Sequence, residues 1–211
     1  MLFLVFAVVF VTGCQNSRKI PTNFDYGSWT DSTYRNDFFG FSLTIPSDWH
    51  ISGQEEMKAL TQQSQDMAFV DQKEMKKFAK IAEITAANLF FVARYTEEEA
   101  ASHAMTNFNI GMIAENISSA DRMDRAKYVS LSRQNLTKAM PGAVIKSETN
   151  TNIGGQEFTS MEVELEINGV RIHQEYLIAL KHKFALCMVL TWFVDSERQQ
   201  LKDILATIKW D

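Results

Sequence analysis

Cysteine is scarce in this chain, which has two among its 211 residues, Cys14 and Cys187. Cys14 ends an apolar opening, so its modification would leave one thiol without an intrachain disulfide partner. Positive charge is also in short supply, because the net charge is −5 at pH 7. Nucleic-acid-binding domains and polybasic membrane patches are both basic. We therefore expect neither nucleic-acid binding nor electrostatic attachment to a membrane.

Short catalytic motifs are missing as well. The sequence contains no GxSxG, HExxH, P-loop or paired-cysteine pattern. Its histidines are scattered and are more typical of structural or solvated positions: His50, His103, His173 and His182. We predict no catalytic residue, no cofactor and no enzymatic activity. A site assembled from distant residues stays open, because catalytic groups meet in space and need not be neighbours in sequence.

The apolar opening has the length of a secretory signal. Residues 1–11 read MLFLVFAVVFV and are followed by Thr12, Gly13 and Cys14. This run is shorter than the roughly 20 residues of a membrane-spanning helix but fits a signal-peptide core of about 7–15 residues. No Lys or Arg precedes it, which is consistent with a true start codon a few positions upstream. An ordinary buried strand or helix is the alternative.

The segment from Val11 to Cys14 resembles the lipobox of bacterial lipoproteins. That resemblance implies a signal peptide at 1–13, cleavage before Cys14 and a diacylglycerol and acyl lipid on Cys14, with no other cofactor. Gln15 in the next position resembles the outer-membrane sorting class of Gram-negative lipoproteins. We expect a protein anchored to the membrane by lipid, on the extracytoplasmic side of the cell envelope, in the outer membrane if the cell is Gram-negative.

Residues 14–31 are predicted to be a tether, and residues 32–211 a single globular domain. A flexible tether of this length has a root-mean-square span of roughly 20–25 Å. Trp29 lies in it and is the one tryptophan that we expect to be loosely held. The domain is rich enough in apolar residues for a true core, with 45% hydrophobic residues and 15 Phe.

Strands and helices alternate irregularly along the domain, and the pattern indicates an α+β fold. We expect helices from residue 52, at 71–82, at 121–140 and at 195–208. We expect strands at 41–45, 84–95, 107–116, 143–147, 157–167, 170–180 and 183–193.

Asn168-Gly169 is a strong signal for a two-residue hairpin turn, and such a turn fixes the register of the strands beside it. One face of the hairpin then carries the apolar pairs Ile167–Val170, Leu165–Ile172 and Met161–Tyr176. The other face carries the polar pairs Glu166–Arg171, Glu164–His173 and Glu162–Glu175.

The polar face of the hairpin has two interpretations. Alternating Glu residues are typical of a solvated sheet surface. Alternatively, Glu162, Glu164, His173 and Glu175 form a site for a divalent cation, because carboxylate oxygens and one imidazole are suitable ligands. No second ligand cluster is visible in the sequence.

The strand expected at 183–193 is apolar on both faces. A strand of this kind is central in its sheet and covered on both sides. We expect helices on both faces of an antiparallel sheet, with the hairpin tip projecting beyond them.

Two stretches are similar to the PsbP-like superfamily, which includes many small bacterial lipoproteins. They are YRNDFFGFSLTIPSDW near the start of the domain and the C-terminal series GGQEF, NGVRIHQEY, KFALCMVLTW and LKDILATIKW. The resemblance covers about Tyr34 to Trp210 and implies an α-β-α sandwich around an antiparallel sheet. It implies no shared catalytic residues, and its better-known members are accessory or assembly factors that bind other proteins.

These observations favour an anchored, non-catalytic interaction or accessory module with a protein partner in the envelope. The alternative is a lipoprotein that binds a small ligand or a divalent metal ion.

Overall fold

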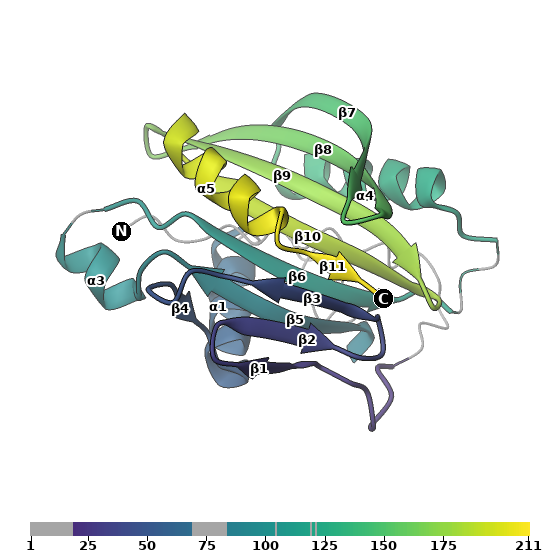
Figure 1. Cartoon of the computed structure of the whole chain (residues 1–211). Helices are drawn as coiled ribbons and strands as arrows, with labels where there is room; N and C mark the ends of the chain where they lie inside the picture. Colours follow the sequence, from purple (N-terminus) through teal and green to yellow (C-terminus); the bar gives the residue numbers. More distant parts are fainter. Residues whose placement is uncertain (1–18, 69–83, 104, 119, 121) are drawn as a thin grey trace.

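The computed structural model describes residues 19–68, 84–103, 105–118, 120 and 122–211. Cys14 and the helix expected at 71–82 lie outside these residues. The described chain forms a seven-stranded antiparallel sheet in the order β4-β5-β6-β10-β9-β8-β7 (Figure 1). Its strands are β4 (His50–Ile51), β5 (Ala86–Ala93), β6 (Asn109–Asn116), β7 (Val144–Ile153), β8 (Gln156–Ile167), β9 (Val170–Lys181) and β10 (Phe184–Trp192).

A second, four-stranded sheet has the order β1-β2-β3-β11. Its strands are β1 (Ser28–Thr30), β2 (Thr33–Asn36), β3 (Phe41–Thr44) and β11 (Lys209–Trp210). The helices are α1 (Gln54–Ala68), α3 (Glu97–Ser102), α4 (Arg125–Ala139) and α5 (Asp195–Leu205). None of the described helices is both long and apolar enough to cross a membrane.

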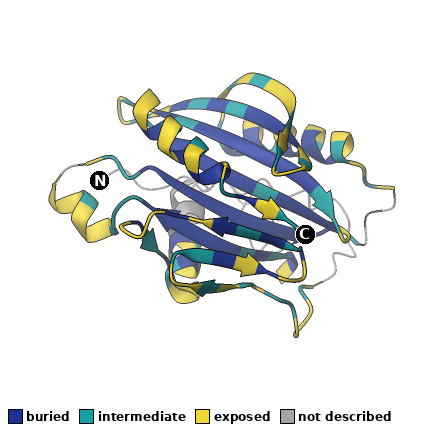
Figure 2. Cartoon of the chain, in the orientation of Figure 1, coloured by how far each residue is buried: buried dark blue, intermediate teal, exposed yellow. Residues whose placement is uncertain are grey.

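β10 is the middle strand of the large sheet, as its two apolar faces predict. On one face, Leu186 packs in the main core cluster with Leu43 of the small sheet and Leu201 of α5. On the other face, Ala185 packs with Tyr128 of α4. Burial is concentrated along these central strands, while the outer side of α5 and much of β7 are exposed (Figure 2).

The fold is therefore an antiparallel sheet between two layers. Helices α1 and α4 cover one face, and α5 with the small sheet covers the other (Figure 1). The α+β class and the helices on both faces are confirmed. The second sheet is a correction, because a single sheet was expected.

The hairpin between β8 and β9 has the register that Asn168-Gly169 predicts. Ile167 pairs with Val170, and the pairing continues to Thr159 and Ile178. Asn168 has φ of 53° and Gly169 has φ of 78°, as a two-residue turn with two left-handed positions requires.

The described part of the expected tether lies on the domain. The Ile20 amide donates to the Ile84 carbonyl at 2.9 Å, and the Asn116 side chain donates to the Lys19 carbonyl at 3.2 Å. Further along, β1 pairs with β2. Trp29 is also held more firmly than expected, because its ring lies 5.4 Å from Tyr34.

Gly27 makes this docking possible. Its φ is 73°, and a Cβ atom there would lie 2.3 Å from the hydroxyl of Tyr34. That hydroxyl donates to the Tyr26 carbonyl at 2.6 Å. A residue with a side chain would be strained and would also displace Tyr34 from the core.

Candidate functional site

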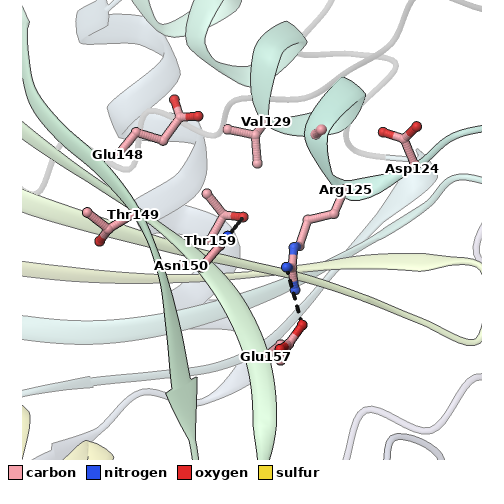
Figure 3. A pocket seen from close by; sticks show the side chains of 9 residues that line it. Asp124, Arg125, Val129, Glu148, Thr149, Asn150, Glu157 and Thr159 are labelled. Carbon is pink, nitrogen blue, oxygen red and sulfur yellow. Dashed lines mark hydrogen bonds and ion pairs between the residues drawn. The ribbon is translucent and has the colours of Figure 1, made fainter.

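An open pocket lies between the start of α4 and strands β7 and β8, and we call it the polar groove (Figure 3). Its volume is about 530 Å³. It is lined by Asp124, Arg125, Ala126, Val129, Glu148, Thr149, Asn150, Glu157 and Thr159. The groove was not predicted, since α4 and these strands bring together residues from separate segments.

Helix α4 is placed over the strands by a cap and two ion pairs. The Asp124 carboxylate accepts from the Lys127 amide at 2.8 Å and so begins the helix. The first residue of the helix, Arg125, pairs with Glu157 of β8, with 3.5 Å between Nη2 and Oε2. Two turns later, Arg133 pairs with Glu148 of β7. The helix is thereby fastened to both strands that form the floor of the groove.

The groove presents charges of both signs. The Arg125 side chain is 27% exposed and the Glu157 side chain is 75% exposed, so water screens the attraction between their charges. Thr159 donates to the side-chain oxygen of Asn150 at 3.2 Å on the floor (Figure 3). Ala126 and Val129 are the apolar lining residues. Small-molecule pockets are mostly apolar, so this lining is better suited to a polar chain.

The residues of the expected cation site lie on β8 and β9 with the predicted register. Glu162 faces Glu175, and Glu164 faces His173. Their carboxylates, however, contact basic side chains. Glu164 lies 3.5 Å from Lys146 and 3.8 Å from His173.

Helix α5 supplies two further basic partners. The Lys202 ammonium donates to Glu175 at 2.5 Å, and Arg198 pairs with Glu162. Ser160 also donates to Glu175, at 2.7 Å. In the described part of the chain, no group of three or more His, Cys, Asp or Glu residues could hold a metal ion.

The cation site of Glu162, Glu164, His173 and Glu175 is therefore corrected to a network of ion pairs. Arg198 and Lys202 were not among the predicted site residues. Their spacing of four residues places both on one side of a helix, and this was the available signal. No pattern among neighbouring residues could show that this helix lies beside the strands that carry Glu162 and Glu175.

Replacing Lys202 by methionine is expected to lower the free energy of unfolding by about 1–3 kcal/mol. Glu175 is 3% exposed, and the substitution removes the cation beside its buried carboxylate. The effect is smaller than for a fully buried pair because the Lys202 side chain is 37% exposed. Urea denaturation measures it.

Lys209→Met is the matched control, since Lys209 is exposed on β11. It makes the same chemical change away from Glu175. Equal losses of stability in the two variants would contradict the role of Lys202.

Cys187 is a structural thiol. It lies partly buried on β10, and burial, with a smaller effect of Glu115, raises its pKa to about 12. A nucleophilic cysteine needs a lowered pKa. The nearby Tyr128 hydroxyl donates to the Glu115 carboxylate at 2.6 Å. These two polar groups are therefore hydrogen-bonded to each other within the core.

No protein-family model and no curated protein matches this chain. Among solved structures, it is similar to cyanobacterial PsbP (CyanoP) from Synechocystis sp. PCC 6803, with 11% identity and a TM-score of 0.52. That match covers 88% of this chain and 96% of the other. At this identity it shows the fold alone, which is PsbP-like, as the two resembling stretches predict.

Two further solved structures have lower TM-scores. LpqN of Mycobacterium tuberculosis, described as involved in cell envelope biogenesis, is 12% identical with a TM-score of 0.45, covering 80% of this chain and 82% of the other. PA94 of Pseudomonas aeruginosa, described as a putative regulator of unknown function, is 17% identical with a TM-score of 0.40, covering 47% and 71%.

Proposed function

We propose that this protein is a non-catalytic accessory protein of the cell envelope, held at a membrane by lipid on Cys14, and that it binds a protein partner in the polar groove. The observation that carries the proposal is the position of the groove. It lies beside β7, which forms one edge of the large sheet and is exposed along much of its length.

An edge strand has one row of backbone donors and acceptors that no neighbouring strand satisfies. An extended peptide can add to such an edge by main-chain hydrogen bonds, and its side chains then enter adjacent pockets. β7 reads VIKSETNTNI. Its polar and charged side chains protect the edge from aggregation while leaving a specific partner free to bind.

The chemistry of the groove favours a partner with polar side chains. Arg125 offers a planar guanidinium for a carboxylate, and Glu148 and Glu157 attract basic groups. A small apolar ligand finds little matching surface there. The lipobox resemblance supports the anchor, and the PsbP-like fold agrees with an accessory role.

The proposal is tested by crosslinking in cells at native expression. A photoreactive amino acid replaces Thr149 of β7, and mass spectrometry identifies what it captures. The matched position is Gln200, which is exposed on α5. We expect a defined envelope protein from position 149 and not from position 200. The same products from both positions, or none from 149, would overturn the groove as the binding site.

Arg125→Glu is expected to lower the yield of that crosslink about tenfold or more. The substitution removes the Arg125 cation from the groove and places a second carboxylate beside Glu157. A tenfold loss corresponds to about 1.4 kcal/mol of binding free energy. Lys127→Glu is the control, because Lys127 is exposed on the same helix and does not line the groove. An unchanged yield with Arg125→Glu would show that the guanidinium takes no part.

A further inference from the structure

One end of the domain gathers exposed aromatic side chains. Tyr26 and Phe38 are both 41% exposed, although large apolar side chains are usually covered. Phe24 joins them, with its ring 5.2 Å from Tyr26 and 5.8 Å from Phe38. His182 lies 5.4 Å from Phe38, in the exposed turn before β10. We call Tyr26, Phe38, His182 and the neighbouring exposed Lys183 the aromatic end.

The chain enters the domain at this same end. The Lys19 carbonyl accepts from Asn116, and Asn116 pairs with Phe184 of β10. The ring of Phe184 lies 5.7 Å from that of Phe38. A series of three contacts therefore connects Lys19 to the exposed ring of Phe38. The segment from residue 19, the β2–β3 turn and the C-terminus all lie at the right of Figure 1.

The short distance along the chain from Cys14 limits which end of the domain can reach a membrane. Five residue steps separate Cys14 from Lys19, and they span at most about 18 Å. A domain of this length has a radius of gyration of about 16 Å, which corresponds to a diameter of about 40 Å. A lipid on Cys14 thus holds the aromatic end close to the bilayer, and the opposite end points away.

The chemistry of the aromatic end suits the lipid headgroup region. Amphipathic aromatic rings and snorkelling lysines prefer that boundary. Three acidic side chains nearby have partners. Asp25 accepts from the Phe38 amide at 3.0 Å, and Asp37 and Asp211 share Arg35, at 2.6 Å and 3.0 Å. At the opposite end, α3 carries three consecutive glutamates, Glu97 to Glu99, which anionic lipids would repel.

We propose that the aromatic end rests on the lipid surface and fixes the orientation of the domain on the membrane. The inference rests on the lipid anchor of the proposed function and adds a second contact to it. Tyr26 and Phe38 enter the headgroup region, Lys183 contacts lipid phosphates, and α3 faces the aqueous compartment.

The test uses the full lipidated protein in vesicles of phosphatidylethanolamine and phosphatidylglycerol. A fluorophore is attached at Asp37→Cys, beside Phe38, or at Glu98→Cys on α3. Nitroxide-labelled lipids then quench each fluorophore according to its distance from the bilayer. We expect quenching to be several-fold stronger at position 37 than at 98. The double substitution Tyr26→Ser and Phe38→Ser is expected to reduce the difference.

The controls separate this inference from the anchor. The intact mass of the protein reports the lipid on Cys14. Lipid present with equal quenching at both positions would overturn the orientation and leave the anchor standing. Lipid absent would overturn both. Crosslinking to another protein through position 37, with no quenching at that position, would show that a protein partner covers the aromatic end. That result would also overturn the proposal.

Discussion

Replacing Cys14 by alanine is expected to move the protein from the membrane fraction to the soluble fraction. Burial of each CH₂ group of an acyl chain contributes about 0.8 kcal/mol, and two or more chains give a stable anchor where one gives a marginal one. Among the residues that the structure describes, the further attachments that we propose are the aromatic end and the polar groove with its partner. We therefore expect nearly complete release, measured by fractionation of cells that express the variant at native level.

Cys187→Ala is the control for this experiment. It removes the other cysteine of the chain, which lies within the domain, and it should leave the protein in the membrane fraction. The intact mass should show acyl lipid on the wild type and on Cys187→Ala, and none on Cys14→Ala. Retention of Cys14→Ala in the membrane fraction would contradict the lipid anchor.

Replacing Phe90 by alanine is expected to lower the free energy of unfolding by about 3–5 kcal/mol. Phe90 lies on β5 and is 1% exposed. Its ring lies 5.0 Å from Tyr34 and 6.3 Å from Trp29, so it joins the large sheet to the small one. Truncation removes this contact and leaves a cavity between the sheets. The midpoint of urea denaturation measures the loss.

Phe38→Ala makes the same chemical change at a side chain that is 41% exposed. We expect it to cost about 1–2 kcal/mol, since the ring is only partly covered, by contacts with rings such as Phe39 and Phe184. Similar losses in the two variants would show that the small sheet is not held by packing on Phe90. The comparison also measures how much the Phe38 side chain contributes to the stability of the fold, apart from any contact with the membrane.

Membrane attachment and partner binding, the two parts of the proposed function, depend on different residues. In these proposals, the anchor and the aromatic end would set the position of the domain on the membrane. The polar groove lies between α4 and the sheet edge and would select the partner. A variant of the groove such as Arg125→Glu should therefore keep its membrane location, and Cys14→Ala should keep its fold.

Much of the fold was predictable because it depends on local chemistry. Asn168-Gly169 permits two left-handed residues in a row, and this sets the register of β8 and β9 through a long series of pairs. The apolar residues on both faces of β10 place it at the centre of the sheet. The lipobox resemblance, which stays a prediction, is equally local, since it depends on a short stretch that ends at Cys14.

The site could not be predicted, because long-range contacts form it. Arg125 and Glu157 are 32 residues apart, and Glu175 and Lys202 are 27 residues apart. Periodicity shows which face of an element is apolar, but it does not show which polar side chains of another element will lie opposite. The cation site was wrong for this reason, as the cations that pair with Glu162 and Glu175 come from α5.

The sequence by itself determined the order of the longer described elements, the centre of the large sheet and the hairpin register, because turn chemistry and side-chain alternation are read from neighbouring residues. The anchor on Cys14 stays a prediction. The tertiary structure decided the small sheet, the docking of residues 19–31, the ion pairs of α5 and the polar groove. Each of these depends on how helices and strands from distant segments pack against each other, and burial of the whole core sets that packing.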